Sequence, residues 1–287
     1  MSDDGQHGIT LIAFVGSVFS PYYAWARRGG RTEANNHCAL NVAIYSRGRS
    51  RWAMTERGRK HCTRNAQEFV IGPSQLQWDG DCLNIDIDEV CVPLPRRVRG
   101  RIKLWPQQLC PFSTRLDAFG QHRWGPLAPA SRIEVDLSTP DLKWQGHAYL
   151  DSNEGDEPID QGFHKWDWSR ARMRDGSTLV FYDMHSPEAP DRVLSLRFRP
   201  NGVVETVDTP PVQRLSKTAW RIDRRMRSEK SVRVQEQLED TPFYQRALLQ
   251  FDYAGEPLLA FHETLSVPRL VSPIVQAMLP WRMPRRA

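Results

Sequence analysis

The sequence has no long apolar run. Its longest apolar-rich stretch, Ile9 to Phe19, has 11 residues and contains Gly16 and Ser17. A helix that crosses a bilayer needs about 20 predominantly apolar residues. Together with a mean hydropathy of −0.57, this excludes a polytopic membrane protein. The 287 residues suffice for one large domain or two smaller ones, and ten Trp, seven Tyr and eleven Phe exclude a disordered chain.

Paired cysteines and the common nucleotide and hydrolase motifs are also missing. The five Cys lie at irregular spacing and none forms C-x-x-C. We therefore expect no disulfide framework, no structural zinc and no bound metal, and a reducing compartment. The sequence has no G-x-G-x-x-G, P-loop or G-x-S-x-G motif, which argues against a nucleotide-binding α/β fold and against a serine hydrolase.

Lysine is scarce, because 33 of the 39 cationic residues are Arg. The net charge of +5 allows a modest attraction to an anionic surface. Two clusters are candidate contacts for such a surface: Arg96 to Lys103 and Arg221 to Arg227. The sequence has no Gly-aromatic RNA signature and no paired Cys-His finger, so we expect no nucleic-acid partner.

Most of the periodic segments alternate with period two. Apolar residues alternate with polar ones in four segments: 83–88, 133–137, 194–199 and 232–235. Turn signals punctuate them at Asp79-Gly80, Asp175-Gly176, Asn201-Gly202 and Gly255-Glu256-Pro257. This pattern predicts half-buried antiparallel strands and an all-β sandwich or barrel.

One segment near the end of the chain has a helical period. The apolar residues between Leu270 and Leu279 fall on one stripe, Pro273 fits only a first turn, and Pro280 is expected to end the helix. Two interpretations stay open: a short C-terminal helix packed on a barrel, or an interfacial membrane anchor followed by a basic tail.

The segment from His147 to Asn153 is the first candidate for chemistry. If it is extended, His147, Tyr149, Asp151 and Asn153 share one face. Such a face is too polar for a core, so it either meets solvent or lines a pocket. Further acids follow up to Asp160, and crowded carboxylates can raise the pKa of one member, as a general acid requires.

Tryptophans cluster on both sides of this segment. Trp124 and Trp144 precede it, and Trp166 and Trp168 follow it. Such density is typical of ordinary barrel packing, but it also suits an apolar cleft whose ring faces stabilise a cation.

Several long motifs resemble those of the carotenoid 1,2-hydratases, which are also called hydroxyneurosporene synthases. The resemblance covers essentially the whole chain and is carried by residues 14–26, 36–42, 52–58, 146–158, 166–170, 238–244 and 280–284. It implies two lipocalin-like antiparallel β-barrel domains, at 1–160 and 161–287, with a short C-terminal helix. Family members carry a further N-terminal segment before the equivalent of Ser2-Asp3-Asp4-Gly5, so the first domain is expected to lack its first strand.

The resemblance also implies a reaction. It is the cofactor-independent addition of water to the terminal C1=C2 double bond of an acyclic carotenoid such as neurosporene or lycopene. Protonation at C2 would give a tertiary cation at C1, which water captures. The expected catalytic residues are Asp151 as acid, Tyr149 and Trp124 beside it, and His147 as an alternative base. The expected substrate-binding residues are Trp144, Trp166, Trp168, Tyr22 and Tyr23.

The substrate implies a location, since a carotenoid is too apolar to travel through water. We expect a cytoplasmic protein that docks peripherally on an anionic inner or photosynthetic membrane, or receives its substrate from other enzymes of the pathway. Two alternatives remain: a lipocalin-like carotenoid or lipid carrier, and a double-barrel cyclase or pericyclase. The Tyr149–Asp151 pair favours the hydratase, because a pericyclic template needs no strong acid.

Overall fold

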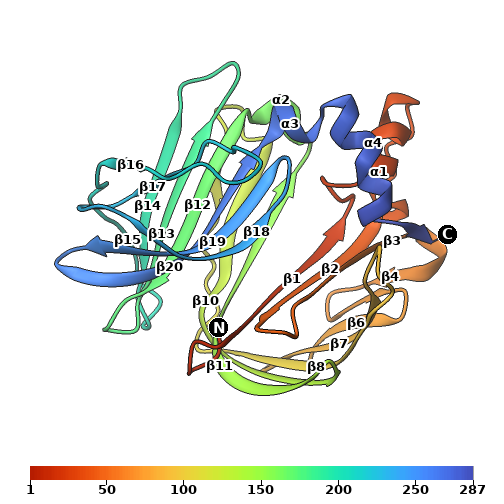
Figure 1. The fold of residues 1–287 in the computed structure, drawn as a ribbon, viewed down its shortest axis with the longest axis horizontal. Helices are drawn as coiled ribbons and strands as arrows, with labels where there is room; N and C mark the ends of the chain where they lie inside the picture. Colours follow the sequence, from red (N-terminus) through yellow and green to blue (C-terminus); the bar gives the residue numbers. More distant parts are fainter. Residues whose placement is uncertain (287) are drawn as a thin grey trace. The chain divides into compact units, whose positions relative to one another are not determined.

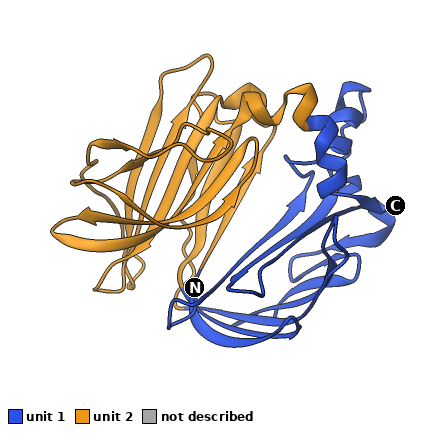
Figure 2. Cartoon of the chain, viewed as in Figure 1, with its two compact units in different colours: residues 1–106, 131–148, 276–287 blue, residues 107–130, 149–275 orange. Residues whose placement is uncertain are grey.

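The computed structural model describes residues 1–286, and they form two compact units that each combine separate stretches of the chain. Unit 1 contains residues 1–106, 131–148 and 276–287, and unit 2 contains residues 107–130 and 149–275 (Figure 2). The expected boundary between residues 160 and 161 lies inside unit 2. Two long strands, β10 (His122–Thr139) and β11 (Asp141–Gly155), have residues in both units.

Unit 1 is built on two sheets (Figure 1). The first has the order β1-β2-β3-β21, and the second continues from β11 and β10 through β8-β7-β6-β5-β4. The remaining strands of these sheets are β1 (His7–Val15), β2 (Cys38–Ser46), β3 (Arg51–Arg57), β4 (Cys62–Arg64), β5 (Glu68–Ile71), β6 (Ser74–Trp78), β7 (Leu83–Val90), β8 (Arg97–Pro106) and β21 (Arg285–Arg286). The core contains Val42 from the first sheet and Ile102 and Val135 from the second.

Unit 2 is built on a seven-stranded antiparallel sheet with the order β15-β14-β13-β12-β20-β19-β18. Its strands are β12 (Lys165–Arg172), β13 (Thr178–His185), β14 (Arg192–Phe198), β15 (Val204–Thr206), β18 (Arg233–Asp240), β19 (Tyr244–Tyr253) and β20 (Glu256–Ser266). A two-stranded sheet of β16 (Val212–Arg214) and β17 (Arg225–Arg227) and the short β9 (Thr114–Arg115) complete the unit. Leu179, Phe251 and Met226 belong to one apolar core.

The all-β expectation is confirmed, and the alternating segments are strands. In β7, Ile85 and Ile87 are buried, and in β10, Val135 and Leu137 are buried. The turn glycines have positive φ angles, such as 83° at Gly176, which a residue without Cβ adopts at little cost.

Helices are few and short. They are α1 (Pro21–Arg28), α2 (Ile159–Gly162), α3 (Val267–Leu270) and α4 (Pro273–Arg282), with single 3-10 turns at Ala34–Asn36 and Arg59–His61. Ser20 caps α1 by accepting a hydrogen bond from the Tyr23 amide at 2.9 Å. No helix in the described part of the chain has the length and apolar character that crossing a membrane requires.

The C-terminal helix differs in detail from the expectation. Pro273 begins α4, as its first-turn position requires, but α4 continues through Pro280 to Arg282. The expectation that Pro280 ends the helix is therefore wrong. Leu279 and Met283 are buried on either side of this proline, and the Met283 amide donates to the Leu279 carbonyl at 2.7 Å. This packing and hydrogen bond hold the last turn, although proline has no N–H to donate.

Candidate functional site

The candidate site of unit 2 centres on Asp151, in the second half of β11. The indole Nε1–H of Trp124 donates a hydrogen bond of 2.9 Å to Asp151 Oδ2. Trp124 lies on the neighbouring strand β10 and is 1% exposed. Two adjacent strands therefore fix the carboxyl, because the donor is a rigid ring locked in the interior.

The surroundings of Asp151 favour its neutral form. Burial and, to a smaller extent, the charge of Glu263 raise the pKa of Asp151, whereas the Trp124 hydrogen bond, Arg170 and Tyr149 lower it; the net result is a pKa raised to about 6. The side chain still keeps some accessible surface. A carboxyl with these properties can hold a proton close to neutral pH and still be reached by a reactant.

Aromatic rings surround this carboxyl. The Tyr149 ring lies 5.6 Å from Trp168, and Trp124 lies 5.8 Å from Tyr182. Trp166 joins the set through its contact of 6.4 Å with Tyr182. Burial and the neighbouring Asp151 raise the pKa of Tyr149 well above its usual value, so its hydroxyl remains protonated. That hydroxyl is buried, and within residues 1–286 it makes no hydrogen bond of ordinary geometry.

Two charged residues that sequence reasoning missed, Arg170 and Glu263, lie on the face of the β12–β20 pair that carries Trp166 and Trp168. Arg170 on β12 lies with its guanidinium carbon 5.1 Å from the Tyr149 ring centroid. Glu263 on β20 pairs in register with Trp168. Alternation along Trp166-Asp-Trp-Ser-Arg170 was a signal for Arg170, because it places this residue with the two tryptophans. No local signal pointed to Glu263, which reaches the site only through strand pairing.

His122 is another residue that sequence reasoning missed. It lies on β10 two residues before Trp124, with its ring 4.7 Å from Phe163 and its Nε2 3.4 Å from the Glu157 carboxylate. Burial lowers its pKa, which favours the neutral imidazole. The alternation of β10 would have placed it on the face of Trp124.

The remaining predicted site residues belong to unit 1. The His147 ring lies 3.5 Å from the Asp3 carboxylate, and Trp144 is part of the core of that unit. On α1, the Tyr23 ring lies 4.7 Å from His37, and Tyr22 lies 5.7 Å from Trp25. The structure thus brings five predicted residues together in unit 2: Asp151, Tyr149, Trp124, Trp166 and Trp168.

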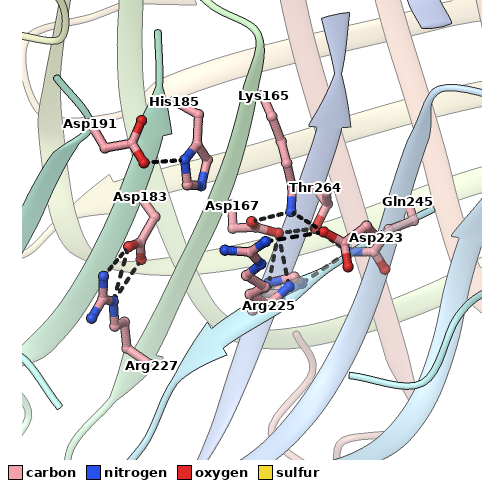
Figure 3. Close-up of polar contacts among 11 residues, drawn as sticks. Lys165, Asp167, Asp183, His185, Asp191, Asp223, Arg225, Arg227, Gln245 and Thr264 are labelled. Carbon is pink, nitrogen blue, oxygen red and sulfur yellow. Dashed lines mark hydrogen bonds and ion pairs between the residues drawn. The ribbon is translucent and has the colours of Figure 1, made fainter. Parts of the chain in front are cut away.

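The opposite face of the β12–β20 pair carries a second buried carboxylate, Asp167 (Figure 3). Its Oδ1 accepts hydrogen bonds from Thr264 Oγ1 at 2.5 Å and from the Arg225 amide at 3.2 Å, and its Oδ2 lies 2.9 Å from Lys165 Nζ. Gln245 extends this network by donating to Thr264 at 3.0 Å.

This face also changes the interpretation of the second arginine cluster. Arg224 is 3% exposed and donates to Gln245 at 2.9 Å, and Arg227 forms an ion pair with Asp183. Arg224 and Arg227 therefore serve internal contacts, whereas Arg221 is exposed. In the first cluster, Arg97 and Arg101 pair with carboxylates on the neighbouring strand β7. Within residues 1–286, no three His, Cys, Asp or Glu side chains converge in a way that could hold a metal ion.

Comparison with known proteins finds a matching family model and several similar sequences. A family model described as carotenoid hydratase CrtC matches residues 11–287. An acyclic carotenoid 1,2-hydratase from Rubrivivax gelatinosus is 56% identical over 100% of this chain and 72% of its own length. Another protein of the same name, from Thiocapsa roseopersicina, is 51% identical over 99% of this chain and 71% of its own.

A solved structure supports the fold. The crystal structure of an AttH candidate from Nitrosomonas europaea matches with a TM-score of 0.59 at 11% sequence identity, covering 80% of each chain. At this identity the likeness concerns the fold alone, and it agrees with the lipocalin-like expectation. The family match and the two close relatives extend over nearly the whole chain, and the chain therefore belongs to the carotenoid hydratase family.

Proposed function

We propose that this protein adds water to the terminal C1=C2 double bond of an acyclic carotenoid, such as neurosporene or lycopene, with Asp151 as the general acid. The observation that carries this proposal is a carboxyl whose pKa is raised to about 6 among aromatic rings. The names of the relatives from R. gelatinosus and T. roseopersicina agree with this substrate class.

The chemistry of the alkene explains why such a carboxyl is needed. An isolated trisubstituted double bond is a weak base, so it needs an acid that is still protonated at working pH. An apolar chain end beside Asp151 displaces water and favours the neutral carboxyl further. Transfer of the proton to C2 gives the tertiary cation at C1, and capture of water there gives a tertiary alcohol.

The rings supply the second requirement. A cation over an aromatic face gains about 0.5–2 kcal/mol, with the larger values in a desolvated setting. Tyr149 and Trp168 form one ring pair close to Asp151, and Trp124 and Tyr182 form another. After proton transfer, the Asp151 carboxylate also stabilises the cation and can accept a proton from the attacking water.

The direct test is the Asp151→Asn variant, which keeps the shape and removes the acid. We expect its hydration of lycopene to fall about 10²–10⁴-fold. The control is Asp156→Asn, since this residue follows the same strand, is exposed and pairs with Arg123; its rate should stay near that of the parent. If folded Asp151→Asn hydrates lycopene at the parent rate, Asp151 is not the acid.

A carrier is the alternative from a different class. It would retain carotenoid without a mass gain of one water, so mass analysis of lycopene incubated with the protein separates the two functions. An under-bonded carboxyl with a raised pKa favours the hydratase, because a carrier gains nothing from a protonated acid.

We also propose that α4 docks the protein on an anionic membrane, from which the substrate is drawn. Three apolar side chains of this helix, Ile274, Met278 and Trp281, are 76%, 46% and 75% exposed. Their spacing places them on one side of the helix, while Val275 and Leu279 are buried on the other. A net charge of +5 adds attraction to anionic lipids.

Sedimentation with anionic liposomes tests this surface. We expect binding at low salt that weakens as salt is added, and weaker binding for Trp281→Ser than for the parent. The control is Trp220→Ser, which removes another exposed tryptophan, 48% exposed, from a loop of unit 2. No binding at low salt would contradict membrane docking and favour delivery by a partner enzyme.

A further inference from the structure

Arg170 differs from the other buried arginines of unit 2 because its guanidinium makes no hydrogen bond or ion pair with another described residue. It lies between two rings, with its Cζ 5.1 Å from the centroid of Tyr149 and 5.5 Å from that of Phe261. Arg246, which also contacts Phe261, instead pairs with both Glu239 and Glu263. A partly buried guanidinium whose donors are not used by the protein is available to a ligand.

Glu263 offers an acceptor next to these donors. Arg246 Nε donates to its Oε1 at 2.8 Å, and no described residue bonds to its Oε2. In the β12–β20 register, Trp168 lies opposite Glu263 and Arg170 lies opposite Phe261. Arg170 and Glu263 are therefore diagonal neighbours on one face of the sheet, at a spacing that two long side chains can bridge through a small molecule. The Glu263 side chain remains 21% exposed.

Both residues act on the proposed acid. Arg170 lowers the pKa of Asp151 and Glu263 raises it. The Tyr149 hydroxyl also lowers the pKa of Asp151, but within residues 1–286 it makes no hydrogen bond of ordinary geometry. Unused donors and acceptors thus converge around the carboxyl, and an apolar polyene cannot satisfy them.

We propose that Arg170 and Glu263 hold the water molecule that attacks the cation. This inference rests on the proposed hydration reaction. The guanidinium donates an N–H to the water oxygen, and the Glu263 carboxylate accepts one water hydrogen. The second hydrogen points to Asp151, and the remaining lone pair faces C1. A water held in this way has the three or so protein partners that buried waters usually make.

The reaction then balances. The Asp151 proton moves to C2 as the π electron pair forms the C–H bond, which leaves C1 positive. The water lone pair forms the C1–O bond, one water proton passes to the Asp151 carboxylate, and the other remains in the product hydroxyl. Asp151 is again protonated. While the carbocation exists, Arg170 also compensates the negative charge of the Asp151 carboxylate. Arg170 itself repels the carbocation, and the negative charge of Glu263 offsets this repulsion.

The test measures how the cation partitions. In D₂O, Asp151 delivers deuterium to C2. The cation then captures water, or it returns a proton to Asp151 and leaves deuterium in the recovered alkene. For Arg170→Met, we expect hydration of lycopene to fall about 10–10²-fold while deuterium incorporation changes little. Glu263→Gln should shift the ratio in the same direction. Because both products come from the same folded molecules, their ratio does not depend on how much of the variant folds.

Each other outcome has a defined meaning. Arg170→Met that hydrates at the parent rate overturns the proposal, as does equal loss of hydration and deuterium incorporation, which would place Arg170 at the acid step. Arg170→Lys keeps the charge but loses the planar fork, so it should hydrate less than the parent and more than Arg170→Met. The control Arg174→Met, in the turn after β12, should leave the ratio unchanged. If the parent protein itself neither hydrates nor deuterates lycopene, the proposed function fails before the water site is tested.

Discussion

Two aspartates of unit 2, Asp151 and Asp167, show how differently one fold can treat the same side chain. Asp167 is 4% exposed, accepts hydrogen bonds from Thr264 and the Arg225 amide, and forms an ion pair with Lys165 (Figure 3). Asp151 accepts one hydrogen bond of ordinary geometry, from Trp124, and the Tyr149 hydroxyl also lowers its pKa. Trp168, which packs on Tyr149, follows Asp167 directly on β12, so Asp167 lies on the face of β12 opposite the one that packs against Tyr149 of β11.

Asp167 and Asp151 illustrate two roles of a buried aspartate: one stabilises the fold, and the other is proposed to transfer a proton. Asp167 has two hydrogen-bond donors and a lysine ammonium beside it, whereas Asp151 has one neutral donor of ordinary geometry. For a buried carboxyl with one neutral donor, ionisation costs more free energy. Its pKa is therefore raised, and it keeps its proton to higher pH. The number and charge of the partners, and not burial alone, therefore predict which aspartate transfers a proton.

The largest expected difference concerns stability. Asp167→Asn leaves Lys165, whose side chain is 13% exposed, without its nearest carboxylate. We expect the free energy of unfolding to fall by about 3 kcal/mol, since breaking a buried ion pair is costly and only the more distant Asp223 carboxylate, at 3.6 Å, then remains beside Lys165. Urea unfolding at pH 8 measures this loss. Hydration per folded molecule should remain close to that of the parent; a folded but inactive Asp167→Asn would remove the distinction between the two residues.

Asp151→Asn should change stability in the opposite direction. Burial raises the pKa of Asp151 from 3.8 to about 6, so between these values the folded state holds a proton that the unfolded state has lost. Stability of the parent therefore falls as pH rises from about 4 to 6, and the variant escapes this loss. We expect Asp151→Asn to be more stable than the parent at pH 8 by on the order of 2 kcal/mol.

The expected gain in the free energy of unfolding of Asp151→Asn depends on pH, and this dependence provides an internal control. Below about pH 4 both states of the parent carry the proton, so the difference between parent and variant should shrink toward zero. Unfolding curves at pH 8 and pH 3 give the two values, since the pKa of 3.8 leaves the unfolded residue partly ionised at pH 4. A variant that is less stable than the parent at pH 8 would mean that the fold stabilises Asp151 as a carboxylate.

Much of the fold follows from local pattern. Alternation in β7 and β10 predicts both their extended form and their buried faces, because a strand with one face on a core must repeat every second residue. The composition of the units could not be predicted in the same way. Residues 107–130 join unit 2 although residues 131–148 join unit 1, and no change in composition marks these positions.

In the candidate site, too, some residues follow from the local pattern and others depend on long-range strand pairing. Tyr149 and Asp151 share a face because they are two residues apart on one strand, and the resemblance added Trp124. Glu263 could not be found, because its place beside Trp168 depends on the pairing of β12 with β20. Single-strand alternation predicts what shares a face, whereas long-range register decides what meets across strands.

The smallest expected effect concerns the hydrogen bond that the Trp124 indole donates to Asp151. The Trp124 hydrogen bond lowers the pKa of Asp151. Trp124→Phe removes the donor and keeps a ring, so the pKa should rise and make Asp151 still less like Asp167. Because the protonated carboxyl is the active form, kcat/KM should decline on the alkaline side, and this decline should move to higher pH in the variant. The pH profile of lycopene hydration measures the shift.

Trp166→Phe is the matched control for this shift. Its ring contacts Phe163 and Tyr182, but it makes no bond to Asp151. The alkaline limb of its pH profile should stay where the parent has it, even if the rate falls through altered packing. A limb that moves to lower pH in Trp124→Phe would show that the indole donor keeps the proton on Asp151, which is the reverse of what its geometry implies. The profile therefore tests the sign of the interaction, and a loss of rate alone cannot do so.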